Sequence, residues 1–414
     1  MKLAGRNRGC LNVRSMKRLH PIHPFPARMA SEIVWDELPE RAGRLRVLDP
    51  MAGSGTTLVA AKLRGHEAVG FDRDPLAVLI ARAWLANVAP DEIEAKASEV
   101  VARACERARD LSIGDAYPRA ADNETKEFVR YWFDETNRRH LTALSETIFR
   151  LHDPVVKDLM WCALSRLIIT KQSGVSRAMD ISHSRPHRSY DKAPKLALGN
   201  FEHAVKQITK ACPFQDTDEN PPGSVGFADA RRLPLENNSV DIVITSPPYL
   251  NAIDYIRGHK FSLIWMGHSI EELREVRTTN VGTEVVAKPV KGDESTENIM
   301  QMMCAGDDLS SRHAGMLRRY VRDMRGVLSE TKRVLRTGGK AVFVVGNCNL
   351  RQTFVENSKC IEGIANELGM AVGTIRRRPL PENRRYLPPP SSSGAGKQLK
   401  KRIREEVILT LLKN

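Results

Sequence analysis

Residues 46–57 restrict the fold of this 414-residue chain more than any other segment. They read Arg-Val-Leu-Asp-Pro-Met-Ala-Gly-Ser-Gly-Thr-Thr, an apolar run that ends in an acidic residue and a glycine-rich turn. The stretch 58–63 follows with helical character, and a second short apolar run, 68–71, ends at Asp72. Strand, turn, helix and strand in this order make a βαβ unit, whose strands are parallel. The sequence therefore predicts an α/β fold with a ligand site at the carboxyl edge of a parallel sheet.

The glycine turn predicts a site for a small ligand. Gly53 and Gly55 allow the backbone to approach a ligand closely, and Asp72, 19 positions after Gly53, is suited to ribose hydroxyls. The third glycine of the dinucleotide fingerprint is missing, and Asp49 precedes the turn. A carboxylate there disfavours a phosphate and favours a cationic group, such as the ammonium of a methionyl ligand. The alternative is an ordinary turn between a strand and a helix.

The rest of the chain divides by pattern. Residues 76–215 are mostly helical in periodicity, and strand signals return at 240–245, 340–345 and the two stretches 370–377 and 406–412. A polar region without clear periodicity, about 280–312, is predicted to be a mobile loop.

Composition excludes several classes of protein. The chain is 41% hydrophobic and 28% charged, as in a globular protein with a sizeable core, and no run approaches the roughly 18 apolar residues of a membrane span. The start has no apolar stretch of the signal-peptide type. The seven cysteines include no Cys-x-x-Cys pair, which argues against a disulfide framework and a structural zinc site. We expect a cytoplasmic protein without membrane contact.

Basic charge is concentrated in three segments. The chain has 64 basic and 50 acidic side chains, and its net charge of +14 comes from residues 1–46 (+6), 171–210 (+5) and 376–404 (+9), against −6 for the remainder. A basic surface on a slightly acidic body suits a polyanion, because each neutralised phosphate releases counterions. A merely solvated basic surface is the alternative.

The segment Thr245-Ser246-Pro247-Pro248-Tyr249 follows the strand signal 240–245 and narrows the function. It resembles the catalytic loop of S-adenosylmethionine-dependent DNA amino-methyltransferases, whose pattern is Asp/Asn/Ser-Pro-Pro-Tyr. The serine version is typical of the cytosine-N4 enzymes. The resemblance implies methyl transfer from S-adenosylmethionine to the exocyclic N4 of cytosine in DNA, with Ser246, Pro247, Pro248 and Tyr249 as the catalytic residues.

Other segments resemble this family in the expected order. Residues 20–27 are similar to its N-terminal cofactor segment, 49–55 to its glycine loop, and 336–339 to the turn into its fifth strand. Asp72 matches the ribose acid and Asp229 the position beside the adenine. The cofactor residues that the resemblance implies are Phe25, Pro26, Asp49, Pro50, Ala52, Gly53, Gly55, Thr56, Asp72 and Asp229.

The resemblance also implies an architecture. We expect a Rossmann-like class I methyltransferase with a mostly parallel seven-stranded sheet and a helical insertion. Residues 1–90 would hold the N-terminal cofactor segment and the first part of the methyltransferase domain, 91–215 a mainly helical insertion for target recognition, and 216–414 the catalytic part. Little chain follows the last predicted strand, so target recognition is assigned to insertions, chiefly this helical segment, with residues 270–315 as a second candidate.

The catalytic loop suits the chemistry of an exocyclic amine. The lone pair of such an amine is conjugated into the ring, so a site must orient it toward the methyl donor. The Ser246 hydroxyl and the Pro247 carbonyl can accept the two N–H hydrogens, and the two prolines hold these acceptors rigid. Tyr249 offers a ring on which a target base, flipped out of double-stranded DNA, can stack.

Four competing functions and one competing site are weighed against this interpretation. Adenine N6 is an alternative target because the loop serves both amines, and an RNA base amino-methyltransferase and a catalytically silent nucleic-acid-binding protein are further alternatives. A carbon-5 cytosine enzyme is disfavoured because the chain has no Pro-Cys dipeptide. His20 and His23 lack a further ligand pair nearby, so no metal site is predicted.

Two basic segments are candidate nucleic-acid contacts. Residues 182–190 mix base-reading, phosphate-binding and stacking side chains, and an exposed solvated loop is the alternative. The arginines near 376–385 are either phosphate contacts or a charged strand end. The predicted contact residues are Arg185, His187, Arg188, Tyr190, Arg376, Arg377 and Arg384. A cognate restriction endonuclease is a possible partner, and the sequence leaves monomer and dimer open.

Overall fold

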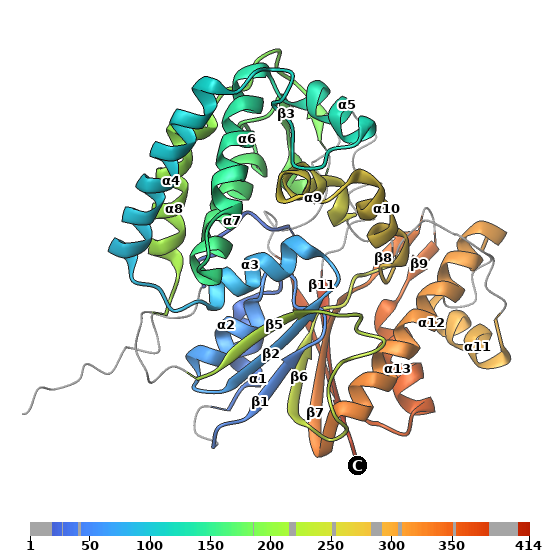
Figure 1. The fold of residues 1–414 in the computed structure, drawn as a ribbon. Coiled ribbons are helices and arrows are strands. Elements are labelled where there is room, and N and C mark those ends of the chain that lie inside the picture. The colour runs from blue at the N-terminus through green and yellow to red at the C-terminus, as the bar shows by residue number, and fades with distance from the viewer. Residues whose placement is uncertain are drawn as a thin grey trace, which may run out of the picture.

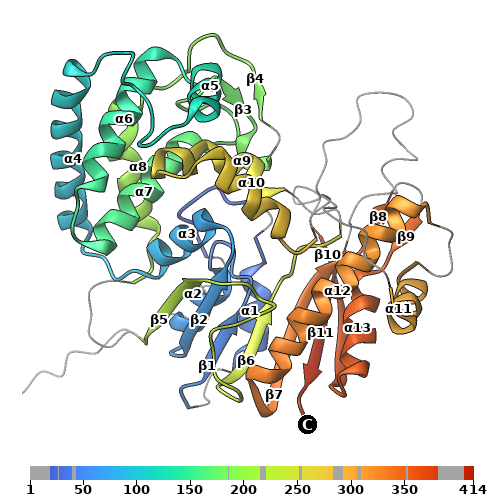
Figure 2. The same cartoon turned by 45° about the vertical axis from the view of Figure 1, so that its right-hand side comes forward.

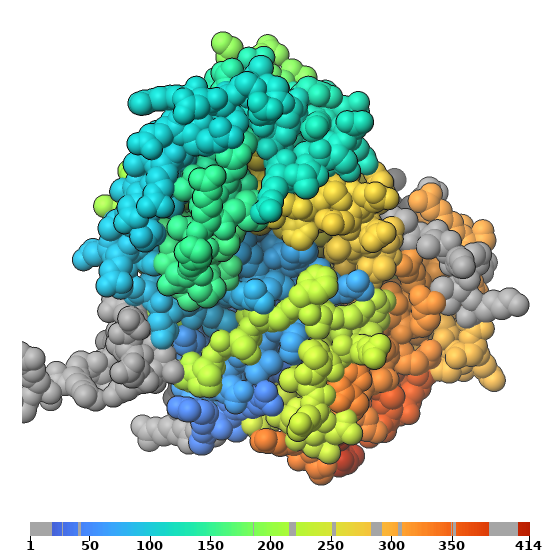
Figure 3. Space-filling model, viewed as in Figure 1, coloured from blue at the N-terminus to red at the C-terminus, as the bar shows by residue number. Residues whose placement is uncertain are grey.

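The computed structural model describes residues 19–26, 28–39, 43–184, 186–214, 221–250, 254–282, 292–304, 309–350, 353–380 and 405–414. Its centre is a seven-stranded sheet flanked by helices, with a layer of further helices above one half of it (Figure 1). In the space-filling view this layer, cyan to green, rests on the blue part of the sheet domain, and the orange and red C-terminal elements lie to the side (Figure 3). Among the described residues, no helix combines the length and apolar character needed to cross a membrane.

The main sheet has the order β10-β11-β7-β6-β1-β2-β5. Its strands are β5 (Gly223–Phe227), β2 (Glu67–Asp72), β1 (Arg46–Asp49), β6 (Val240–Thr245), β7 (Leu335–Gly346), β11 (Glu405–Leu412) and β10 (Ala371–Pro379). Neighbouring strands from β5 to β7 are parallel, and β11 runs antiparallel to both β7 and β10. The predicted mostly parallel seven-stranded sheet is confirmed.

Alternation along the strands builds two cores. Successive residues of a strand point to opposite faces, so each buried strand supplies both faces of the sheet. One face packs on α1 (Ser31–Glu37), α2 (Thr56–Leu63) and α3 (Pro75–Leu85), and the other on α12 (Ser311–Val334) and α13 (Asn357–Glu367). The strand residues on the first face include Val47, Ile242, Val342 and Ile408, and those on the second include Leu48, Val243, Phe343 and Leu409.

The helical layer is inserted between β2 and β5. It consists of α4 (Pro90–Asp110), α5 (Asn123–Trp132), α6 (Glu135–Phe149), α7 (Pro154–Ile168) and α8 (Ala197–Ala211), with a small hairpin of β3 (Ala178–Met179) and β4 (His187–Arg188). Helices α5, α6 and α7 each begin at an aspartate whose side chain accepts a backbone N–H of the first turn. These elements lie almost entirely within the segment 91–215 that the sequence predicts to be helical.

After β6 the chain crosses back under this layer. Helices α9 (Tyr255–Leu263) and α10 (Ile270–Thr279) follow, and α10 begins with a capping box between Ser269 and Glu272. A two-stranded hairpin, β8 (Cys348–Leu350) and β9 (Thr353–Val355), extends from the end of β7.

The region predicted to be one mobile loop, about 280–312, contains a helix. Residues Glu294–Cys304 form α11, which buries Ile299, Met300 and Met303 against the core that α12 and α13 share. Arg318 of α12 bonds to Glu297 at 2.5 Å. The loop prediction is wrong for these residues, because the overall polarity of the region hid one apolar stripe at helical spacing. Residues 283–291 and 305–308 lie outside the described part of the chain.

Candidate active site

Two loops meet at the carboxyl edge of the sheet, because β1 and β6 are parallel neighbours paired at Leu48 and Val243. The glycine loop follows β1 and the Ser-Pro-Pro-Tyr loop follows β6. The Asp49 carboxylate, which is 2% exposed, accepts a hydrogen bond of 2.7 Å from the Thr245 hydroxyl. A buried bond therefore joins the last residue of β1 to the residue that precedes Ser246.

The glycine loop is a closed turn held by Asp72. Gly53 has a φ of 51°, in the left-handed region, and its N–H donates to the Asp72 carboxylate at 2.8 Å. The other Asp72 oxygen accepts the Asp74 N–H at 2.9 Å. Each of these oxygens keeps acceptor capacity, so a ribose hydroxyl can still bond to Asp72.

Gly55 is buried against α3, where packing requires a residue without a side chain. Its φ is 89°, and a Cβ built on it would lie 2.9 Å from the Cβ of Ala81 on α3. Thr56 starts α2 and is buried, as are Pro50 and Ala52. Gly53 is half-buried and therefore lies closer to solvent than the buried Gly55.

The two acids beside the glycine turn, Asp49 and Asp72, both have raised pKa values. Burial raises the pKa of Asp49 to about 6, against hydrogen bonds from Thr245, Thr57 and the backbone of Met51 that lower it. Burial also raises the pKa of Asp72 to about 6, and the neighbouring Asp74 adds to the shift. A cationic ligand would offset the cost of ionising both carboxylates.

Asp229, predicted to lie beside the adenine of the cofactor, already accepts four hydrogen bonds from two arginines. One carboxylate oxygen accepts the backbone N–H and the Nε–H of Arg231, and the other accepts from Arg231 Nη2 at 2.7 Å and Arg73 Nη1 at 2.8 Å. Partial burial raises the pKa of Asp229, but the hydrogen bonds from Arg231 and the positive charges outweigh burial, so the pKa is lowered. Four donors saturate this carboxylate, which therefore orients Arg73 and Arg231.

The N-terminal segment lies across the glycine loop. A Cβ on Gly53 would contact the Phe25 ring at 3.5 Å, and the Phe25 ring stacks on Tyr255 of α9 with centroids 5.5 Å apart. Pro26 is buried. His23 is buried behind them, where Nε2 and the Ser165 hydroxyl are 2.9 Å apart, and burial lowers the pKa of His23 well below its usual value.

The catalytic loop is braced from two sides. The Ser246 hydroxyl donates to the Val344 carbonyl of β7 at 3.0 Å, and the Cys348 thiol donates to the Leu250 carbonyl at 3.3 Å. Ser246, Pro248 and Tyr249 are half-buried, and Pro247 is buried. Because the Ser246 proton is already used, the lone pairs of its oxygen are what it can offer to a ligand amine.

The predicted nucleic-acid contacts are not gathered in one place. His187 and Arg188 are exposed on β4, with Tyr190 half-buried beside them. Arg376 and Arg377 lie on the edge strand β10, where Arg376 pairs with Glu37 and Arg377 with Glu405 at 2.6 Å. These ion pairs favour the charged strand end over phosphate contacts. Arg185 and Arg384 lie outside the described residues.

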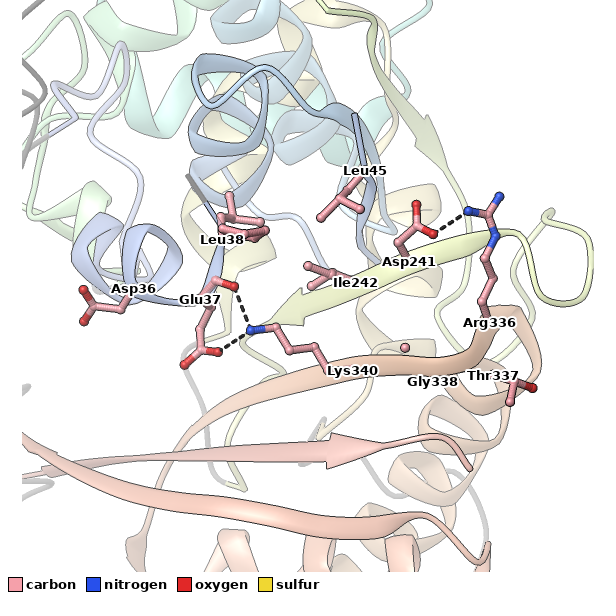
Figure 4. A pocket seen from close by; sticks show the side chains of 12 residues that line it. Asp36, Glu37, Leu38, Leu45, Asp241, Ile242, Arg336, Thr337, Gly338 and Lys340 are labelled. Atoms are coloured by element: carbon pink, nitrogen blue, oxygen red, sulfur yellow. Dashed lines mark hydrogen bonds and ion pairs between the residues drawn. The ribbon is translucent and has the colours of Figure 1, made fainter. Parts of the chain in front are cut away.

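A pocket of about 540 Å³ opens at the opposite edge of the sheet (Figure 4). It lies at the amino ends of β1, β6 and β7, and four of its charged side chains form two ion pairs: Lys340 with Glu37, and Arg336 with Asp241. Neither of the two loops contributes to it, so we place the active site at the carboxyl edge instead.

Two contacts of the site carry no signal in the sequence. The Thr245–Asp49 bond joins residues 196 apart, and His259 of α9 bonds through Nδ1 to Asp74, 185 residues away. The Asp-Pro dipeptide at 74–75 signals the cap of α3, where Asp74 accepts the Leu76 N–H, but nothing local indicates His259.

The residues present fit S-adenosylmethionine. Gly53 brings the backbone close to the edge of the sheet, Asp49 and Asp72 are carboxylates suited to a cationic methionyl end and a ribose, and Phe25 provides an apolar cover. The described residues hold no cluster of three or more His, Cys, Asp and Glu side chains arranged to bind a metal.

The chain is similar in sequence to several Type II methyltransferases. The chain is 24% identical over 274 residues to the Type II methyltransferase M.BsoBI of Geobacillus stearothermophilus, covering 58% of this chain and 51% of that protein. It is 21% identical over 371 residues to M.MvaI of Kocuria varians, covering 82% and 79%. It is also 21% identical over 402 residues to M.AvaI of a Nostoc species, covering 85% and 78%. The chain therefore spans about half the length of M.BsoBI. No protein-family model matches it.

Solved structures are more distant. An S-adenosylmethionine-dependent methyltransferase of Methanosarcina mazei aligns over 92% of this chain and 97% of its own, with 8% identity and a TM-score of 0.32. A putative DNA modification methylase of Thermus thermophilus, solved with S-adenosylmethionine, aligns over 45% and 53%, with 18% identity and a TM-score of 0.23. The α/β fold of this chain rests on its own mostly parallel seven-stranded sheet.

Proposed function

We propose that the chain is a DNA methyltransferase that transfers a methyl group to the exocyclic N4 of cytosine in double-stranded DNA. The observation that carries the proposal is the buried Asp49–Thr245 bond, which fixes the cofactor loop against the Ser-Pro-Pro-Tyr loop. The similarity to Type II methyltransferases supports DNA as the substrate. The Ser-Pro-Pro-Tyr sequence supports cytosine N4.

Bound S-adenosylmethionine supplies a methyl group that is already activated by its positive sulfur. The task of the protein is then to orient the amine. The Ser246 hydroxyl donates a hydrogen bond to the Val344 carbonyl, so its oxygen can accept an N–H of the target amine. The Pro247 carbonyl is the second acceptor. Positioning of this kind can contribute roughly 7–11 kcal/mol in favourable cases.

The half-buried ring of Tyr249 is the proposed stacking platform for a base flipped out of the duplex. The helical segment 91–215 is proposed to recognise the target. A cognate restriction endonuclease, suggested by the Type II class of the relatives, remains part of the proposal.

One experiment tests this function. The protein is incubated with labelled S-adenosylmethionine and mixed DNA or mixed RNA, and the nucleosides are then analysed by mass spectrometry. N4-methylcytosine in DNA is the expected product. N6-methyladenine or an RNA product would replace the proposed substrate, and no labelled product would refute the proposed activity.

A further inference from the structure

The hairpin formed by residues 178–188 is fastened to the end of α5. Its strands pair Ala178 with Arg188 and Met179 with His187. The Arg177 backbone N–H donates to the Trp132 carbonyl at 2.8 Å, and its guanidinium donates to the Arg130 carbonyl at 3.2 Å. The hairpin and α5 lie side by side above α9 and α10 (Figures 1 and 2).

One side of this hairpin is buried against α9. Ile181, Ser182 and Ser184 are at most 5% exposed. A Cβ on Gly258 of α9 would lie 2.6 Å from the Ile181 carbonyl oxygen, so the helix touches the hairpin backbone directly. Asp180 and Ser184 adopt left-handed φ values of 59° and 55°, a strained conformation that such packing maintains. The hairpin is therefore held at a fixed distance from α9, the first helix after the catalytic loop.

The other side is exposed, polar and basic. His187 and Arg188 face solvent, and the Arg188 guanidinium lies 5.0 Å from the ring centroid of Tyr131, a residue of α5 that is 51% exposed. Asp180, the single acid among residues 177–190, is paired with His183 and so leaves the charge of Arg188 unopposed by an acid of this segment. Guanidinium groups and an exposed aromatic ring are complementary to phosphates and bases.

We propose that this exposed side, Tyr131 with His187 and Arg188, is the surface that holds duplex DNA beside the target base. Gly258 sets its distance from the catalytic loop. This inference rests on the proposed function and adds the contact surface, including Tyr131, which the sequence alone did not single out.

The test uses the full chain with Tyr131→Ala and Arg188→Ala combined. Binding of a fluorescent, mixed-sequence DNA duplex is measured by anisotropy at several salt concentrations. The double variant should bind roughly tenfold more weakly, with a salt slope smaller by about one. Its affinity for S-adenosylmethionine, measured by calorimetry, should equal that of the wild type. Arg103→Ala, an exposed arginine on α4, is the matched control and should leave both affinities unchanged.

The outcomes separate the two proposals. If the double variant binds duplex DNA with the affinity and salt slope of the wild type, the proposed contact surface is wrong. It is also wrong if the variant loses affinity for S-adenosylmethionine as much as for DNA. Tighter wild-type binding to single-stranded DNA or RNA would overturn duplex DNA as the occupant. A wild-type protein that neither binds nor methylates any duplex would refute the proposed function itself.

Discussion

At the scale of single residues, the site depends on which protons and lone pairs are already committed. The Ser246 hydroxyl donates its hydrogen bond to the Val344 carbonyl, and the Asp229 carboxylate accepts from Arg73 and Arg231. The Ser246 oxygen can therefore still accept a hydrogen bond from a substrate amine, whereas the Asp229 carboxylate has no acceptor position left. Residue type alone does not distinguish these two situations.

Removing the Ser246 hydroxyl tests whether its oxygen accepts a hydrogen bond from the target amine. Ser246→Ala should leave the affinity for S-adenosylmethionine nearly unchanged and lower the single-turnover methyl-transfer rate by roughly ten- to a thousandfold, as for one lost orienting interaction. Ser98→Ala, an exposed serine on α4, is the control and should retain the wild-type rate. A wild-type rate in the Ser246 variant would mean that the acceptor lies elsewhere.

The raised pKa values of Asp49 and Asp72 predict a pH dependence of cofactor binding. The cationic cofactor favours ionised carboxylates, so affinity should be full above about pH 6 and fall as the pH drops through about 6. Between about pH 4 and 6, Asp49 and Asp72 stay protonated in the folded cofactor-free protein but ionise in the unfolded chain. The free energy of unfolding should therefore increase as the pH falls from about 6 toward 4. Calorimetric titration with S-adenosylmethionine from pH 5 to 8 measures the first effect, and a flat affinity would contradict it.

At the scale of elements, close approach of backbones decides where glycine is needed. Gly55 has a positive φ and lies against Ala81 of α3, whereas Gly65, just after α2, has a positive φ of 84° and would place a Cβ in open space, with no neighbouring atom within 4 Å. The two glycines share a conformation and differ in their surroundings. Their comparison separates backbone strain from helix packing.

Alanine at each position measures the two effects. Gly65→Ala should lower the free energy of unfolding by about 1–2 kcal/mol, the cost of a left-handed conformation for a residue with a Cβ. Gly55→Ala should lose that amount and about 1–3 kcal/mol more, because its Cβ would displace α3. Urea unfolding of both variants checks this, and equal losses would show that α2 and α3 are not in close contact here.

At the scale of the whole molecule, net charge does not locate the DNA. The most basic segment of the sequence, 376–404, begins in β10, where Arg376, Arg377 and Arg378 pair with acids of α1 and β11. The hairpin next to α5 has fewer charges, but its His187 and Arg188 face solvent. Pairing, more than composition, determines which basic groups can meet phosphates.

Arg376→Ala should therefore affect folding more than DNA binding. Its pair with Glu37 is part-exposed, so the loss of unfolding free energy should be at most about 1 kcal/mol. Duplex affinity should stay at the wild-type value across salt concentrations, while the wild-type protein itself binds less tightly as salt increases. Anisotropy and urea unfolding give the two numbers. A tenfold loss of duplex affinity would show that β10 contributes to DNA binding.

The sequence by itself determined the βαβ unit, the parallel sheet and the two loops at its carboxyl edge, because these depend on local turns and on apolar runs with a fixed period. It also placed Phe25 and Asp72 at the same site through the family resemblance. Only the tertiary structure decided that Asp229 is saturated, that Gly55 serves packing and that α11 is a helix. Each of these depends at least in part on a distant partner: Arg73 for Asp229, Ala81 for Gly55, and the core of α12 and α13 for α11. Local sequence does not record which partner fills an acceptor or covers an apolar stripe.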